Sequence, residues 1–384
     1  MAKLRHSAAG RTAAWGDNDA RPELHTLRGR MLRVLLLWFI CGVWVLGIAG
    51  FMALWVASLL SVARWVVTRG ETPVPRYVQL YLSVMAVYES YYYATRPSRH
   101  QWPLMRRLTR YVFTHYPYFR LNVTVFEERK EAERKLRKEE TTTTTTTTAA
   151  ACKAVEENDI SSFVEPNDHA LFAFHPHGVL SCGWSFGGVH HMSFERADCR
   201  WLVADILFYF PVMRELVNWM DFTSAAKPAF KEVMRTGQSV CLMPGGFEEA
   251  TLYERGKHRV YIKKRFGFIK LALQHGYKVH PVYTFGEEYA YYTFPFLLKL
   301  RLKLNEFKMP GVLFFGRPEC FYLPRTDVDL ITVVGKPIAL PRIEHPTKED
   351  VRKYHGLYVT ALQHLFDQHK GVYAVDPEAT LEIY

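Results

Sequence analysis

A run of 30 residues without a charged side chain, residues 34–63, places the strongest constraint on how this chain can fold. A transmembrane helix needs only about 20 apolar residues, so a soluble buried helix is a poor explanation for so long a run. The run is also longer than the apolar part of a signal peptide, about 7–15 residues. We therefore predict a membrane anchor.

The form of the anchor follows from its length and its flanking charges. One straight helix over the run would be about 45 Å long, against a hydrocarbon core of about 30 Å. Three glycines near its middle would permit a break: Gly42, Gly47 and Gly50. Basic residues lie on both sides, so the positive-inside rule favours both ends in the cytosol. We predict a helical hairpin or re-entrant anchor, with one tilted span as the alternative, and no glycosylation at the Asn122 sequon.

Composition divides the chain into five regions. Residues 1–30 are polar and predict a disordered cytosolic N-terminus. The anchor occupies residues 31–68. The aromatic and basic residues 69–126 are typical of helices at a membrane interface, although an ordinary soluble helical layer has a similar composition. Residues 127–160 include eight consecutive threonines and form a low-complexity insertion, and residues 161–384 make up the remaining domain.

From Ala170 onward, short apolar runs alternate with helical stretches, which predicts an α/β fold with a mixed sheet and flanking helices. The predicted strands are residues 170–174, 239–243, 279–285, 311–315 and 330–334. One helix is predicted over residues 267–275, with Gly276 just past its end. Another is predicted over residues 348–370, with a Thr347–Asp350 capping box at its start and Gly371 at its end.

Two histidines follow the first predicted strand, in His175-Pro176-His177-Gly178. The proline and glycine predict a tight turn at the carboxyl end of a buried strand, the usual place for chemistry in an α/β sheet. Histidine is also the side chain best suited to take a proton near neutral pH. The sequence therefore makes His175 and His177 candidate catalytic residues, with Gly178 in the turn.

A glycine-rich turn follows the second predicted strand, in Pro244-Gly245-Gly246-Phe247-Glu248-Glu249. Glycines let the backbone approach a ligand closely, so the N–H groups of Gly245 and Gly246 can face developing negative charge. Glu248 or Glu249 is placed to orient a histidine from the first turn. Taken alone, the turn is more simply a strand-to-loop connection with solvated glutamates.

The net charge of +11 suits an anionic partner. The chain contains no nucleic-acid-binding module, so the membrane or a phosphate-bearing ligand is favoured. A basic cluster that includes Lys264, Arg265 and Lys270 is either a solvated face or a site for an anionic group. The six cysteines are scattered without a CxxC pair, which argues against a disulfide scaffold or a zinc site and fits a reducing, cytosol-facing domain.

One motif points to different chemistry. Residues 183–187 fit G-x-S-x-G, the nucleophile elbow of α/β-hydrolases, with Ser185 as the nucleophile. That elbow needs a strand immediately before it, whereas the predicted strand ends about eight residues earlier. A metal at His190-His191 lacks a nearby acidic or cysteine cluster. We expect neither a serine nucleophile nor a metal.

Six elements, in order, resemble the type-2 diacylglycerol acyltransferase family, which includes monoacylglycerol and wax-ester relatives. They are His175–Gly178, Pro244–Glu249, Arg265–Ala272, His280–Glu287, Val334–Ile338, and Tyr354–Tyr358 continued by Leu365–Lys370. The likeness covers residues 170–384 and the placement of the anchor. The family's upstream Tyr-Phe-Pro element stands here as Tyr116-Pro117-Tyr118, and the threonine-rich insertion has no counterpart in the family pattern.

The resemblance implies a membrane-anchored, glycerolipid-acyltransferase-like enzyme. It would transfer an acyl group from acyl-CoA to the hydroxyl of diacylglycerol and form triacylglycerol. Monoacylglycerol, a sterol or a long-chain alcohol are alternative acceptors. Acyl-CoA is a substrate, and no cofactor is implied. The enzyme would lie in the endoplasmic reticulum membrane and on lipid droplets, with its catalytic domain, residues 161–384, in the cytosol. The resemblance allows a homo-oligomer and does not decide the oligomeric state. A serine esterase acting through Ser185 and a non-catalytic lipid-droplet adaptor are the competing hypotheses.

The resemblance also implies roles for individual residues. Transfer would be direct, without an acyl-enzyme. His177 would take the proton of the acceptor hydroxyl, with His175 as a second candidate base or a positioning group, and Glu249 would hold the imidazole. The remaining roles are oxyanion stabilisation by the N–H groups of Gly178, Gly245 and Gly246, and binding of the CoA phosphates by Lys264, Arg265 and Lys270.

Overall fold

The computed structural model describes residues 50–95, 102–115, 118–127, 167–211, 213–307, 311–318 and 323–384, together with residues 26, 27, 29, 31, 35, 164 and 321. The chain divides into two compact units. The smaller unit comes from residues 24–112 and 207–221, and the larger unit includes residues 113–206 and 222–384.

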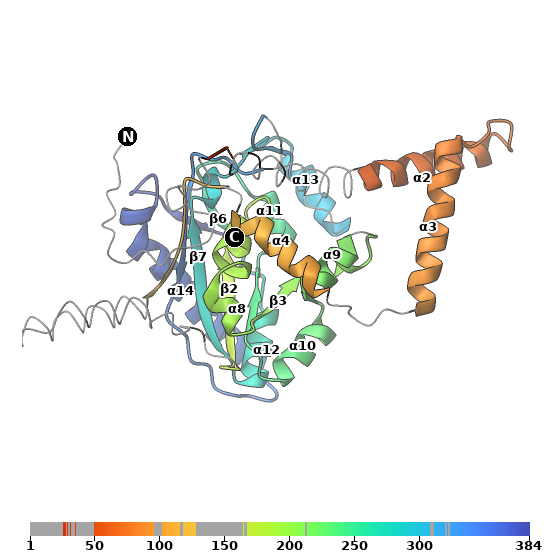
Figure 1. Ribbon diagram of the computed structural model, residues 1–384. Coiled ribbons are helices and arrows are strands. Elements are labelled where there is room, and N and C mark those ends of the chain that lie inside the picture. The colour runs from red at the N-terminus through yellow and green to blue at the C-terminus, as the bar shows by residue number, and fades with distance from the viewer. Residues whose placement is uncertain are drawn as a thin grey trace, which may run out of the picture. The chain divides into compact units, whose positions relative to one another are not determined.

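A mixed sheet forms the centre of the larger unit (Figure 1). Its strands are β1 (Leu121–Phe126), β2 (Ala170–His175), β3 (Arg200–Val203), β4 (Thr223–Ser224), β5 (Val240–Leu242), β7 (Lys278–Phe285) and β10 (Asp329–Val334). Within the described residues these seven strands have the order β1-β10-β7-β2-β5-β3-β4. The β10–β7 pair is antiparallel and the other neighbours are parallel. The predicted α/β class and mixed sheet are confirmed.

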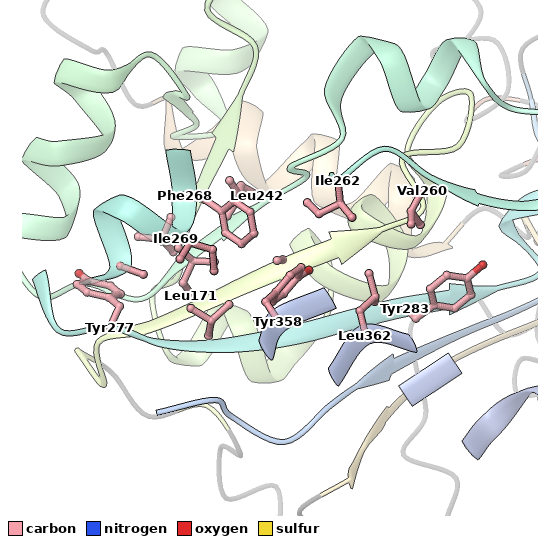
Figure 2. Close-up of a cluster of buried hydrophobic side chains, with 14 of the residues drawn as sticks. Leu171, Leu242, Val260, Ile262, Phe268, Ile269, Tyr277, Tyr283, Tyr358 and Leu362 are labelled. Carbon is pink, nitrogen blue, oxygen red and sulfur yellow. The ribbon is translucent and has the colours of Figure 1, made fainter. Parts of the chain in front are cut away.

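Helices cover both faces of strand β2, all six of whose residues are buried. On one face lie α10 (Lys227–Arg235), α12 (Gly267–His275) and α14 (Lys348–Tyr373), which form the main core with Leu171 and Ala173 (Figure 2). On the other lie α7 (Cys182–Trp184), the π-helical turn η3 (Ser185–Val189) and α8 (Met192–Arg196), whose Phe194 contacts Phe172 and Phe174. Because side chains alternate along a strand, His175 points to the α14 face.

The two predicted helices form where local sequence signals placed them. Helix α12 spans Gly267–His275, and Gly276 follows it with a φ of 69° in the left-handed region. Helix α14 begins with the expected capping box between Thr347 and Asp350. Its predicted end at Gly371 is wrong, because the helix continues through this glycine to Tyr373. The capped, amphipathic segment thus tolerates a glycine in its last turn.

Two small sheets lie apart from the central one. Strand β11 (Leu381–Ile383) pairs in parallel with β6 (His258–Val260), and β8 (Tyr292–Thr293) pairs antiparallel with β9 (Phe314–Phe315). The predicted strand over residues 311–315 is therefore wrong in part: only Phe314 and Phe315 form a strand, and it is outside the central sheet. The shorter elements of this unit are α11 (Gly246–Thr251), α13 (Leu298–Leu304), η5 (Glu287–Tyr289) and η6 (Asn305–Phe307).

The smaller unit is helical. It contains α2 (Phe51–Val67), α3 (Arg76–Thr95), most of α4 (Pro103–His115) and α9 (Met213–Trp219); η4 (Asp205–Phe208) spans the boundary between the units. Buried Arg214 of α9 donates to Glu89 of α3 at 3.1 Å and lies over the Tyr92 ring, 3.7 Å from its centroid. This ion pair and ring contact fasten α9 to α3.

Several sequence predictions fall on residues that the structure does not describe. They concern the N-terminus up to residue 25, most of the first half of the anchor, residues 128–160 and the Tyr116-Pro117 pair. Within the described residues, no helix combines the length and the hydrophobicity needed to cross a bilayer. The hairpin anchor and the character of the insertion stay predictions.

Candidate active site

Three neighbouring strands end at one edge of the sheet and deliver the candidate residues there. Strands β7, β2 and β5 are parallel neighbours, so their carboxyl ends meet. His175 is the last residue of β2, the Pro244-Gly245-Gly246 turn follows β5, and Glu287 follows β7. Crevices at such edges are where α/β proteins usually bind ligands.

The imidazole of His175 is held from both sides and has no exposed surface. Its Nδ1 lies 3.1 Å from Oε1 of Glu249, and its Nε2 lies 3.0 Å from the hydroxyl of Tyr358 on α14. A carboxylate only accepts, so Nδ1–H donates to Glu249 and Nε2 accepts from the Tyr358 O–H. With both nitrogens occupied, His175 has the geometry of a positioning residue.

The carboxylate of Glu249 connects three chain segments and is also fully buried. Besides His175, it accepts the backbone N–H of His177 at 2.6 Å and that of Tyr261 at 2.7 Å. A Cβ on Gly245 would lie 2.0 Å from Oε2 of Glu249, so only glycine leaves room for the carboxylate here. Glu249 therefore holds the ring of His175 but the main chain, not the ring, of His177.

His177 is the histidine whose ring is available for chemistry. It is partly exposed, and its Nδ1 lies 3.1 Å from the carbonyl oxygen of Gly178 and 3.4 Å from the Ser181 hydroxyl. Because a carbonyl only accepts, Nδ1 carries the proton and the Nε2 lone pair is left for a substrate. Burial lowers the pKa of His177, and the hydrogen bond to Gly178 and the charge of Glu249 oppose this only in part. The ring is thus neutral at pH 7, as a general base must be.

Gly178 and Glu287 together shape the turn after His177. Gly178 has a φ of 62°, and a Cβ on it would lie 1.9 Å from Oε1 of Glu287. The buried Glu287 carboxylate accepts the N–H groups of Cys182 at 3.1 Å and Gly183 at 2.6 Å. Burial raises the pKa of Glu287 to about 8, while these two hydrogen bonds act in the opposite direction. Glu287 thus fastens the far side of the turn as Glu249 fastens the near side.

The glycines of these two turns carry backbone donors that the described residues leave unengaged. Neither Gly178 nor Gly245 donates its N–H to an acceptor among the described residues. Gly246 has a φ of 59° and begins helix α11, and the N–H groups of a first helical turn have no intrahelical acceptor. These donors suit a developing oxyanion.

The predicted phosphate-binding residues are in two different situations. Arg265 pairs with Glu248, donates to the Gly245 carbonyl oxygen at 3.3 Å, and so braces the glycine turn. Lys264 and Lys270 are exposed and form no ion pair with a described residue. The two lysines are therefore the side chains of the three that are free to meet phosphate.

Tyr358 and Glu287 are site residues that the motif analysis did not single out for a role. Tyr358 ends the Tyr354–Tyr358 element of the family resemblance, and its place in a predicted helix gives no sign that its hydroxyl meets His175. Glu287 had a detectable signal, an acidic residue directly after a long buried strand, but its partners Cys182 and Gly183 lie more than 100 residues away.

Ser185 does not stand on a strand-to-helix elbow. The short helix α7 precedes it directly, and it begins the helical turn η3. No histidine ring hydrogen bonds the Ser185 hydroxyl within the part of the chain that the structure describes. The arrangement that a hydrolase elbow requires is thus not formed around this serine.

The part of the chain that carries this site is similar to known proteins. A family model described as Diacylglycerol acyltransferase matches residues 152–384. Diacylglycerol O-acyltransferase 2 from Dictyostelium discoideum is 34% identical over 242 residues, covering 58% of this chain and 73% of that protein. Human 2-acylglycerol O-acyltransferase 3 is 33% identical over 227 residues, covering 53% of this chain and 65% of that protein. The crystal structure of a 1-acyl-sn-glycerophosphate (LPA) acyltransferase from Thermotoga maritima matches with a TM-score of 0.37 and 14% identity, covering 88% of this chain and 95% of that one.

Proposed function

The chain belongs to the diacylglycerol acyltransferase family, and we propose that it transfers a fatty acyl group from acyl-CoA to the hydroxyl of diacylglycerol, forming triacylglycerol and free CoA. The family match includes every candidate site residue. The observation that carries the proposal is His177, a neutral base with an available Nε2 beside two unengaged glycine N–H groups. Acyl-CoA is a substrate, and the reaction needs no cofactor or metal.

The names of the relatives point to two acceptors, because one relative is named for diacylglycerol and another for 2-acylglycerol. Monoacylglycerol is therefore the second candidate acceptor. A sterol and a long-chain alcohol also carry the single hydroxyl that the chemistry needs. We propose diacylglycerol, and the assay described below compares the acceptors directly.

The geometry supports direct transfer with His177 as the base. Its Nε2 takes the proton of the acceptor hydroxyl while that oxygen attacks the thioester carbonyl carbon. The N–H groups of Gly178 and Gly245 stabilise the resulting oxyanion. When the carbon–sulfur bond breaks, the sulfur takes the proton back from His177, so the base is regenerated and CoA leaves as the thiol.

His175, Glu249 and Tyr358 support the base without meeting the substrate. The hydrogen bond from the His177 N–H to Glu249 holds the main chain from which the base projects. The charge of Glu249 also favours the imidazolium that forms during attack. His175 and Tyr358 satisfy the rest of this carboxylate-centred network, so the network stays rigid in a dry interior.

We assign the CoA phosphates to Lys264 and Lys270, at the water-facing side of the site. Lysine serves as a point charge for phosphate, and both side chains are exposed. Arg265 contributes through the glycine turn that it braces. Substituting the two lysines should raise the KM for acyl-CoA more than it lowers kcat, because they contact the nucleotide part rather than the reacting carbon.

We propose a location in the endoplasmic reticulum membrane and on lipid droplets, with the catalytic domain in the cytosol. Besides the uncharged run, one face of the β8–β9 pair supports this. It exposes 43% of Tyr292, 53% of Phe294, 66% of Leu313 and 40% of Phe315. Aromatic and aliphatic side chains of this kind suit a lipid interface. Asn122 has no exposed surface in β1, which fits an unglycosylated sequon.

A radiochemical assay tests the function. Membranes from cells lacking their own triacylglycerol synthesis receive labelled oleoyl-CoA with diacylglycerol, monoacylglycerol or a fatty alcohol. We expect label in triacylglycerol, a loss of about 10²–10⁴-fold with His177→Ala, and retained activity with Ser185→Ala. Free fatty acid released in a Ser185-dependent reaction would establish the esterase instead. No ester product from any acceptor, despite normal expression, would favour the adaptor.

A further inference from the structure

A basic hollow lies at the edge of the sheet opposite the candidate active site. Its volume is about 360 Å³, and its walls come from α10, the end of α12, the residue before β2 and residues 342–345. Figure 1 shows α10 and α12 beside each other at this edge. Strand β2 leads from His169 at the hollow to His175, and six steps of about 3.3 Å separate the two edges by about 20 Å. The hollow is thus a separate place from the site of His177.

Positive charge converges on this hollow with little to balance it. The lining includes Lys231, Arg235 and Arg342, together with three histidines and a single carboxylate, Glu344. Neither Lys231 nor Arg342 forms an ion pair with a described residue, and Arg235 pairs only with exposed Glu232 at 2.8 Å. By contrast, Arg259, Arg265 and Arg325 of the same unit each pair with a carboxylate.

The pKa of His275, a histidine that lines the hollow, responds to the charge of these cations. His275 ends α12, and its pKa is lowered by burial first and then by the charges of Lys231 and Arg342. The same charges would be stabilised by an anion placed among them. A volume near 360 Å³ falls within the range of about 300–1,000 Å³ that small-molecule sites occupy.

The walls of the hollow are fixed before any ligand arrives. The N–H of Ile343 donates to the Leu273 carbonyl at 2.8 Å, and the Gln274 side chain donates to the Glu344 carbonyl at 3.2 Å. These bonds join the 342–345 segment to α12. The main chain beside Arg342 is therefore held in place, so less of the chain has to be ordered when an anion binds.

Helix dipoles alone do not explain the cluster. Cations at a helix C-terminus are stabilised by the dipole, which accounts for Arg235 in the last turn of α10. Lys231 lies in the middle of α10, and Arg342 is on no helix. Those two are the cations without a carboxylate partner, so they are the pair whose placement a ligand would explain.

We propose that this hollow is a binding site for a phosphate-bearing anion, held by Lys231 and Arg342. Arginine and lysine are the side chains that recognise phosphate, through charge-assisted hydrogen bonds. Both a soluble phosphate compound and the headgroup of an anionic lipid present this chemistry. The site is independent of the acyl transfer proposed above, since it lies at the other edge of the sheet.

Calorimetric titration of the purified full chain in detergent tests the site, with sodium pyrophosphate as one probe and monomeric dioctanoyl phosphatidate as the other. We expect Lys231→Gln/Arg342→Gln to weaken binding by about tenfold or more, because two charge-assisted contacts are lost. The matched control, Lys299→Gln/Lys303→Gln, removes two exposed lysines of α13 that do not line the hollow and have no part in the proposed acyl transfer, and it should keep the affinity within about twofold. Binding of pyrophosphate assigns a soluble phosphate, and binding of the phosphatidate alone assigns a lipid headgroup.

Three results would overturn the proposal: neither probe binds, the two double variants weaken binding equally, or only the control variant does. Equal loss would mean general surface charge, and loss in the control alone would place the anion at α13. Circular dichroism shows that each variant is folded. Triacylglycerol synthesis by Lys231→Gln/Arg342→Gln, measured without added anion, reports on the proposed function separately, so failure of one proposal does not decide the other.

Discussion

At the scale of single residues, two histidines two positions apart have different surroundings and therefore different roles. The ring of His175 is buried between Glu249 and Tyr358, whereas His177 keeps one nitrogen free. Strand alternation turns His175 toward the α14 face, and β2 ends at this residue, so His177 lies in the turn at the sheet edge. A base and its support thus follow from one short segment of chain.

The pH profile of acyl transfer should report the pKa of His177. Burial lowers this pKa below the ordinary value of about 6.5, so the ring stays neutral to lower pH than a free imidazole. We expect kcat/KM to fall on the acid side with an apparent pKa below about 6.5. Rates measured from pH 5 to 7.5 test this, and His364→Gln, which removes an exposed histidine of α14, should leave the limb in place. An apparent pKa above the ordinary value would contradict the assignment.

Removing the hydroxyl of Tyr358 should lower the free energy of unfolding measurably. Tyr358→Phe leaves the buried Nε2 of His175 without its donor, which costs about 1–3 kcal/mol in the free energy of unfolding. Urea denaturation gives the value. Tyr354→Phe, one turn earlier on α14 and half-buried, is the matched control and should change little. Equal effects from the two variants would show that the hydrogen bond to His175 does not matter.

At the scale of elements, the turn between β2 and α7 is held by two glutamates that follow two other strands of the sheet. Glu249 follows β5 and binds its near side, and Glu287 follows β7 and binds its far side. Both side chains accept backbone N–H groups of this turn or of the residues that follow it. The shape of the turn therefore depends on the pairing of β2 with both neighbours in the correct register.

Gly178→Ala should damage both fold and activity. The new Cβ would meet Glu287 and force a non-glycine residue into the left-handed region, so we expect a loss of about 2 kcal/mol or more and little acyl transfer. Gly356→Ala is the control: nothing lies within 4 Å of its Cβ, and alanine in a helix should add up to about 1 kcal/mol. Thermal unfolding and the triacylglycerol assay check both. Normal activity of Gly178→Ala would remove the turn from the mechanism.

At the scale of the whole molecule, the family match and the candidate active site occupy the same part of the chain. The match begins at residue 152, and the site residues lie between His175 and Tyr358. The threonine run precedes the match. The catalytic unit thus assembles from the strands and helices that follow residue 152, together with β1 at its edge.

Deleting residues 141–150 should leave acyl transfer within about twofold of the full chain, because a polar, low-complexity run has no apolar surface to bury. The deletion removes the threonines but stays outside the family match. Initial rates with oleoyl-CoA and diacylglycerol, normalised to protein in the membrane, test this. A large loss would assign the insertion a role in the reaction.

Much of the catalytic unit could be predicted because its signals are local. The 170–174, 239–243, 279–285 and 330–334 strands are apolar runs bounded by turn residues, and each became a strand of the central sheet. The caps of α12 and α14 are also local. The prediction of a strand over residues 311–315 was wrong in part. A short apolar run has the same sequence pattern whether it forms a core strand or lies on an exposed face.

Prediction from local sequence reached the α/β pattern, the caps, the anchor-like run and the residues of the two turns, since each depends on neighbours a few positions apart. The three-dimensional fold sets what those residues do. It placed Glu249 on the ring of His175 instead of that of His177, brought in Tyr358, and set Glu287 against Gly178. These partners are 74 to 183 residues apart for His175 alone. Contacts of that kind depend on strand order and register, which no local pattern encodes.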